Sequence, residues 1–220
     1  MDWLGRIRRQ SQAHAPVAAE PEETPRSFVE RGAPGIEALF ADQREDGSHA
    51  VLDLGASAET KLRLYSRYAR RIRFADLVSD PPLGSAWADA LALLRPHPEQ
   101  LFDLVLAWNL LDRLPPEERP PLVRRLAQLT TPNARLYLLV DGSGAPTAPP
   151  LRFSLLELDR VRQEAIGPPA PTHPQLLPAE VERLLAPFEV VRAFTLRLGL
   201  REYVAIKGGK ALRGTPWRRK

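Results

Sequence analysis

The segment VLDLGASAET, residues 51 to 60, combines residue types and spacing that ligand-binding turns use. An apolar run ends at Leu54, Gly55 allows a tight turn, and a helical pattern follows. Where a strand, a turn and a helix meet in this way, backbone N–H groups face a bound ligand, and a glycine lets the ligand approach closely. This turn is therefore the first candidate for a functional site.

Two phosphate-binding fingerprints do not match this turn. A dinucleotide-binding loop reads G-x-G-x-x-G, whereas the turn supplies Gly55, Ser57 and Thr60. The sequence also lacks a loop that ends in Gly-Lys-Ser/Thr, which nucleotide hydrolysis needs. Nucleotide hydrolysis therefore has no support.

The elements around the turn form a strand-helix-strand unit. Residues 50–54 read as a buried strand, residues 61–69 carry apolar side chains at helical spacing, and residues 72–77 read as a second strand. Such a unit joins parallel strands through a right-handed connection in nearly every known case. We expect the two strands to be parallel.

Further elements follow the same alternation. Buried strands are predicted over residues 101–108 and 134–140, with a helix between them that carries Leu122, Leu126 and Leu129 on one face. Apolar spacing across residues 83–94 favours a helix, with a short strand at 89–93 as the alternative. Other helices are predicted over residues 34–42, 153–166 and 178–186, and an antiparallel hairpin over 188–197 and 202–207.

Strands that are apolar almost throughout and alternate with helices indicate an α/β fold with a mostly parallel sheet covered on both faces. Ligands bind such sheets at the carboxyl ends of the strands. The turns after Leu54, Leu77, Trp108 and Val140 are therefore where function is expected.

Composition excludes several classes of function. The 220 residues are 44% apolar and 26% charged, as in one globular domain with tails. No apolar run approaches the roughly 18 to 20 residues of a membrane span. The lack of cysteine excludes disulfides and thiolate zinc sites, and the four histidines are too scattered to predict a metal site. Residues 1–10 do not lead into a secretory signal, so a cytoplasmic location is expected.

In its order of elements and motifs, the chain resembles the class I S-adenosylmethionine-dependent methyltransferases. Their first motif is a strand with an acidic residue followed by G-x-G-x-G, and Asp53, Gly55, Ser57 and Glu59 stand at those places. Some ribosomal-RNA methyltransferases of this superfamily read G-A-S-x-G, which Gly55, Ala56 and Ser57 match. The resemblance implies a Rossmann-like, doubly wound, mostly parallel sheet that ends in an antiparallel hairpin.

The resemblance also implies how S-adenosylmethionine would be held. Asp76, which lies 21 residues after Gly55, corresponds to the acidic residue that binds both ribose hydroxyls. Asp89 corresponds to the acidic residue after the third strand, which contacts adenine. Trp108 and Asn109 follow the fourth strand, where the family often lines its substrate pocket. No catalytic residue is identified, since methyl transfer relies largely on positioning.

The same residues have structural interpretations. Asp53 would bond backbone N–H groups at its strand end, and Asp76 would be a turn residue. Asp89 would be a solvated residue on an amphipathic helix. Trp108 and Asn109 would provide core packing and a helix cap.

Glu59 departs from the family pattern. In the family this turn passes close to the amino-acid end of the cofactor, where an anionic side chain would repel the cofactor carboxylate. Two functions therefore stay open. One is a methyltransferase with an unidentified acceptor, and the other is a catalytically inactive, methyltransferase-like scaffold or accessory subunit of a larger complex.

The charge of the chain predicts where partners bind. The net charge is +4, but residues 207–220 carry six basic and no acidic side chains, so residues 1–206 sum to −2.

The chain is predicted to consist of a tail and linker (1–30), a methyltransferase-like domain (31–207) and a basic tail (208–220). Trp3 and Trp217 lie beside basic clusters, which predicts docking to a protein complex through residues 1–10 and 208–220. Nucleic acid and an anionic membrane surface are the alternative partners, and the latter would place the protein peripherally on a membrane complex.

Overall fold

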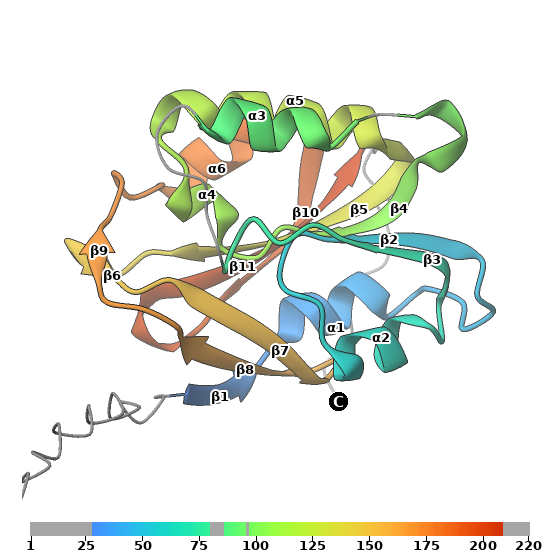
Figure 1. The fold of residues 1–220 in the computed structure, drawn as a ribbon, viewed down its shortest axis with the longest axis horizontal. Coiled ribbons are helices and arrows are strands. Elements are labelled where there is room, and N and C mark those ends of the chain that lie inside the picture. The colour runs from blue at the N-terminus through green and yellow to red at the C-terminus, as the bar shows by residue number, and fades with distance from the viewer. Residues whose placement is uncertain (1–27, 80–85, 96, 209–220) are drawn as a thin grey trace, which may run out of the picture.

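A central sheet of six strands organises the molecule in the computed structural model, which describes residues 28–79, 86–95 and 97–208. The strand order is β10-β11-β5-β4-β2-β3 (Figure 1). β2 pairs in parallel with β3 and β4, β4 pairs in parallel with β5, and β10 and β11 form the antiparallel end. The strands are β2 (His49–Asp53), β3 (Ala69–Phe74), β4 (Phe102–Leu106), β5 (Thr130–Asp141), β10 (Phe188–Thr195) and β11 (Leu200–Lys207). The predicted fold class is confirmed.

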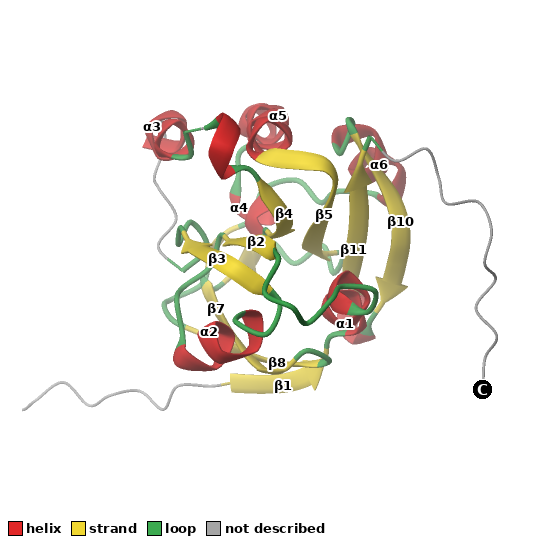
Figure 2. Ribbon diagram, turned by 90° about the vertical axis from the view of Figure 1, so that its right-hand side faces the viewer, coloured by secondary structure: helices red, strands yellow, loops and turns green. Residues whose placement is uncertain are grey.

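Helices cover both faces of this sheet. Figure 1 and Figure 2 show α3, α5 and α6 on one side of it, and α1 and α2 on the other. The helices are α1 (Pro34–Phe40), α2 (Glu59–Tyr65), α3 (Ala86–Leu93), α4 (Leu110–Arg113), α5 (Arg119–Leu129) and α6 (Pro178–Leu184), with short 3-10 turns at Pro98–Gln100, Pro116–Glu118 and Arg197–Gly199. None of the helices in the described ranges has the length and apolar character of a membrane span.

The inner parallel strands β2 and β4 form because they are mostly apolar on both faces, whereas the edge strand β3 carries arginines and is only half-buried. In the register of the sheet, Val51 lies beside Leu104 and Leu52 lies beside Val105. All four side chains are at most 1% exposed. Burial on both faces is what a parallel sheet between two helix layers requires, which explains why these runs were recognisable as strands.

One predicted helix is wrong. Residues 153–166 belong to an antiparallel hairpin of β7 (Leu151–Glu157) and β8 (Arg160–Ala165), which β1 (Phe28–Gly32) extends to a second sheet of order β1-β8-β7. Phe153 and Leu155 are buried while their neighbours Arg152 and Ser154 are only half-buried, and this two-residue period is that of a strand. β1 begins three residues before the predicted domain boundary at residue 31.

The region between β3 and β4 is where the sequence left a helix and a short strand open as alternatives. Residues 86–93 form α3, so the short strand at 89–93 is wrong and the helix is confirmed. In the part of the chain that the structure describes, the central sheet therefore has no strand between β3 and β4 in sequence. Two short strands, β6 (Thr147–Ala148) and β9 (Ala170–Pro171), pair in the loops that follow β5 and β8.

A buried carboxylate ties α1 to the sheet. Glu202 of β11 is fully buried and accepts hydrogen bonds from the Arg31 guanidinium at 2.7 Å, the Gly35 N–H at 2.6 Å and the Tyr137 hydroxyl at 2.9 Å. Burial, with the charge of Glu202 as the next cause, raises the pKa of Tyr137 well above its ordinary value, so this hydroxyl remains a donor. Glu202 thus fixes the segment from Arg31 to Gly35, at the start of α1, to β5 and β11.

Replacement of Glu202 tests this anchor. Glu202→Ala leaves the half-buried Arg31 guanidinium without its carboxylate and the Gly35 N–H without its acceptor, so we expect the free energy of unfolding to fall by about 3 kcal/mol. Tyr137→Phe removes one hydrogen bond and should lower it by only about 1 kcal/mol. Urea unfolding measures both, and equal losses in the two variants would contradict the central role of the carboxylate.

Candidate functional site

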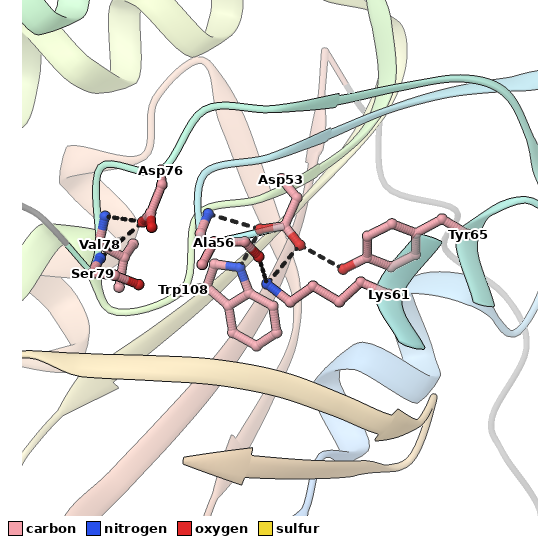
Figure 3. Close-up of polar contacts among 9 residues, drawn as sticks. Asp53, Ala56, Lys61, Tyr65, Asp76, Val78, Ser79 and Trp108 are labelled. Atoms are coloured by element: carbon pink, nitrogen blue, oxygen red, sulfur yellow. Dashed lines mark hydrogen bonds and ion pairs between the residues drawn. The ribbon is translucent and has the colours of Figure 1, made fainter. Parts of the chain in front are cut away.

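The Asp53 carboxylate is the centre of the site at the carboxyl end of β2. It is fully buried and has four partners (Figure 3). Oδ1 accepts the Gly55 backbone N–H at 2.8 Å and the Trp108 indole N–H at 2.5 Å. Oδ2 accepts the Tyr65 hydroxyl at 2.7 Å and lies 3.1 Å from the Lys61 ammonium. A carboxylate out of contact with water needs such partners, because its desolvation is otherwise unfavourable by several kcal/mol.

Lys61 is the unexpected member of this cluster. It is the third residue of α2, and Tyr65 follows four residues later on the same helical face, which is turned toward Asp53. The Lys61 ammonium also donates to the Ala56 carbonyl at 2.9 Å and lies 4.5 Å from the centre of the Trp108 ring. A fully buried lysine thus has a carboxylate, a carbonyl and an aromatic face around its charge.

Tyr65 is held as a donor by its surroundings. Burial, together with the negative charge of Asp53, raises the pKa of the Tyr65 hydroxyl well above its ordinary value. The phenol therefore stays protonated and directs its O–H at Asp53.

Trp108 covers the turn from the end of β4. Its backbone has a φ of +49°, in the left-handed region that a bulky residue rarely adopts. The Trp108 carbonyl accepts the Leu139 N–H at 2.8 Å, and the indole stacks on Phe153 of β7 with ring centres 4.9 Å apart. The second sheet therefore helps to hold the indole above Asp53.

Gly55 has no free face for a ligand in this arrangement. A Cβ atom added at Gly55 would lie 2.9 Å from the Trp108 indole nitrogen and 3.2 Å from the Lys61 ammonium. The close approach that a glycine offers is thus taken by the chain's own side chains. Ser57 and Glu59, at the other two glycine positions of the motif, are exposed.

The remaining predicted ribose and adenine residues lie apart from this cluster. Asp76 is exposed after β3, and its Oδ1 accepts the N–H groups of Val78 at 3.2 Å and Ser79 at 2.9 Å (Figure 3). This is the side-chain-to-backbone turn of the structural interpretation. Asp89 is exposed on α3 and does not follow a strand.

A second feature lies at the carboxyl ends of β4 and β5. A cleft of about 510 Å³ opens there, within the size range of small-molecule sites. Asn109 lines it and is only 7% exposed, and its Oδ1 has no hydrogen-bond partner among the described residues. The rest of the lining comes from the ends of β4 and β5, the loops after β5 and β8, and the second sheet, and includes Asp112, Arg113, Leu139, Asp141, Leu151, Gln163, Thr172, His173 and Gln175.

Asp112 is a titratable group of this cleft that the motif comparison did not identify. Burial raises the pKa of Asp112 to about 7. The hydrogen bond that the Asp112 carboxylate accepts from the Asp141 N–H, at 2.8 Å, lowers this pKa, and the negative charge of Asp141 raises it. Burial also lowers the pKa of Arg113. From sequence, Asp112 and Arg113 read as the charged start of a helix, and only the fold turns them toward a cleft.

The structure thus joins four predicted residues and adds two. One cluster contains the predicted residues Asp53, Gly55, Ala56 and Trp108. It also contains Lys61 and Tyr65, which were not predicted from the sequence. Their spacing of four residues on a short helix was the available signal. In the described ranges, no group of three or more His, Cys, Asp or Glu side chains is arranged to hold a metal ion.

Comparison with known proteins identifies the fold. No family model and no curated protein matches the sequence, whereas many solved structures match the fold. One is the 1,6-didemethyltoxoflavin-N1-methyltransferase of Burkholderia thailandensis with bound 1,6-didemethyltoxoflavin and S-adenosylhomocysteine, at 19% identity and a TM-score of 0.50, covering 79% of this chain and 76% of that one. Another is the magnesium protoporphyrin IX methyltransferase of Synechocystis with bound S-adenosylhomocysteine, at 16% identity and a TM-score of 0.48, covering 79% and 80%. The chain has the fold of class I S-adenosylmethionine-dependent methyltransferases.

S-adenosylmethionine is the cofactor that this fold implies, and the residues can be tested against it. The resemblance places the amino-acid end of the cofactor at the turn after β2, and there Lys61 and Trp108 cover Gly55. Asp76, the predicted ribose acceptor, already accepts two backbone N–H groups. As the side chains stand, the turn does not accommodate the amino-acid end.

The pKa of Asp112 gives a test of the cleft. In the unfolded chain this carboxyl releases its proton near the ordinary aspartate pKa of 3.8, whereas the folded protein keeps the proton to about pH 7. A raised carboxyl pKa means that stability falls as the pH rises through this window. Because Asp112→Asn cannot ionise yet keeps an acceptor for Asp141, we expect it to be more stable than the wild type by on the order of 1–3 kcal/mol above about pH 7.

Urea unfolding of both proteins over a pH series measures this difference, which should shrink toward zero near pH 4. Asp89→Asn, at an exposed helical position, is the control and should show no such trend. An Asp112→Asn protein that is no more stable than the wild type at high pH would contradict the burial of this carboxyl.

Proposed function

We propose that this chain is a methyltransferase-like protein that does not bind S-adenosylmethionine through the turn after β2, and that it acts as an accessory or ligand-binding protein. The cleft at the carboxyl ends of β4 and β5 is its proposed ligand-binding site. The proposal takes the second of the two functions that the sequence left open.

One observation carries this proposal. The Lys61 ammonium lies 2.9 Å from the Ala56 carbonyl and 3.1 Å from Asp53, and 3.2 Å from the place that a Cβ atom on Gly55 would take. An amino-acid end at this turn would have to displace a buried ion pair. Breaking a buried ion pair on one side typically lowers stability by about 3–5 kcal/mol, which a cofactor would have to offset on binding.

The other positions that the resemblance assigns support the same conclusion. Asp76 is engaged with the backbone of Val78 and Ser79, and Asp89 is a solvated helical residue. Glu59 adds a carboxylate at a place that is glycine in the family motif. None of these features favours a bound adenosyl group.

A methyltransferase activity is the second candidate, and the cleft is the observation that favours it. Its walls come from the segments after β4 and β5, and the buried Oδ1 of Asn109 is available for a donor on a ligand. The structure of the Burkholderia thailandensis methyltransferase, which has a similar fold, contains bound 1,6-didemethyltoxoflavin and S-adenosylhomocysteine. In this alternative the cleft would receive the methyl acceptor.

Calorimetry separates the two candidates. We expect S-adenosylmethionine and S-adenosylhomocysteine to give no saturable heat with the wild-type protein up to about 1 mM ligand, because Lys61 occupies the turn. Binding of either compound with a Kd below about 100 µM would contradict the proposal and support the methyltransferase.

The partner of an accessory protein is proposed to bind the two tails. Residues 1–10 and most of 208–220 lie outside the described residues, so this part rests on the Trp-bearing basic segments of the sequence. Nucleic acid or an anionic membrane surface, with a peripheral location on a membrane complex, is the alternative binding mode.

Deletion of residues 1–26 and 209–220 tests the tails. Both deletions leave β1 and β11 intact, so circular dichroism should show an unchanged fold. We expect co-purifying proteins to be lost with the tails. Unchanged co-purification would remove the support for tail docking, and a loss of salt-dependent RNA or liposome binding instead would favour the alternative mode.

A further inference from the structure

We propose that Asp53, Ala56 and Trp108 form a binding site for a primary ammonium group, and that the Lys61 side chain is its resident occupant. This inference rests on the proposed function, because a site filled from within the chain does not receive the amino group of an external ligand. We call these three residues the ammonium site.

The contacts of Lys61 are those that recognise an ammonium group. An ammonium has three N–H donors and no acceptor, so it requires acceptors on several sides. The Asp53 carboxylate lies at 3.1 Å, the Ala56 carbonyl at 2.9 Å and the centre of the Trp108 ring at 4.5 Å. The aromatic face adds an attraction that only a cation experiences. A neutral group of the same size would lose both electrostatic contributions.

The ammonium site is held in place without Lys61. Asp53 keeps three other donors, from the Gly55 backbone, the Tyr65 hydroxyl and the Trp108 indole. The indole in turn stacks on Phe153 with an interplanar angle of 8°. Removal of the lysine side chain should therefore leave the carboxylate, the carbonyl and the aromatic face in position, with the positive charge missing.

The surrounding burial makes the missing charge consequential. Asp53 and Lys61 are both 0% exposed, so water does not replace the ammonium freely. A buried carboxylate that has lost its cation favours binding of another cation of matching size. Lys61→Ala removes three methylene groups and the ammonium, which is the composition of the n-propylammonium ion apart from one hydrogen.

The experiment uses the full chain with Lys61→Ala. We expect n-propylammonium chloride to stabilise this variant saturably, with a rise in Tm of about 3 °C at roughly ten times its Kd. Sodium chloride at equal concentration controls for salt, and 1-propanol controls for the alkyl chain without the charge. The wild type should show no specific rise, because Lys61 already fills the site.

Lys207→Ala is the matched control. The Lys207 ammonium is also partly buried and donates to two carbonyls, of Ala127 and Thr130, but among the described residues it has neither a carboxylate nor an aromatic ring as a partner. This variant should respond equally to n-propylammonium and sodium chloride. A response as large as that of Lys61→Ala would overturn the ammonium site, because it would reflect a general effect of alkylammonium ions.

Other outcomes are equally decisive. Equal stabilisation of Lys61→Ala by 1-propanol, or none by n-propylammonium, would overturn the proposal. If Lys61→Ala does not fold alone, its refolding is measured in the two salts. Recovery only with n-propylammonium supports the site, and equal or no recovery overturns it. Binding of S-adenosylhomocysteine to the wild type would instead contradict the proposed function, so the two failures are distinguishable.

Discussion

The ion pair between Asp53 and Lys61 is the constraint on which the site depends. It places two opposite charges where neither contacts water, at the point where β2, α2 and the end of β4 meet. Such a pair is stable only when the surrounding groups complete it, which the Gly55 N–H, the Tyr65 hydroxyl and the Trp108 indole do. The strained backbone of Trp108 and its stacking on Phe153 serve the same arrangement, so the second sheet is coupled to the turn.

This arrangement explains how a methyltransferase fold can keep its architecture while its first motif changes. In the sequence, Asp53 and Gly55 stand where the family motif has its acidic residue and its first glycine. Lys61, on the helix that follows the turn, provides the positive charge that pairs with the Asp53 carboxylate. The cleft beside Asn109 and Asp112 lies at the ends of β4 and β5, and its lining does not include this pair. The proposed function follows from that separation.

Much of this could be predicted from the sequence. The buried strands were recognisable because residues such as Val51 and Leu104 are apolar in runs that only a sheet covered on both faces accommodates. The hairpin at 151–165 was missed because Leu155 and Leu158 stand at a helical spacing of three, while Phe153 and Leu155 stand at the strand spacing of two. Lys61 could not be placed, because lysine is seldom fully buried and a local pattern does not reveal a carboxylate on a distant strand.

The most direct test of the central claim is nitrogen-15 NMR of the lysine side chains. The chain has only four lysines, at positions 61, 207, 210 and 220, so the signals can be assigned by substitution. We expect slowly exchanging ammonium protons and ring-current-shifted methylene protons for Lys61, because its charge is buried against the Trp108 ring. Exchange and chemical shifts of a solvated lysine at position 61 would contradict it.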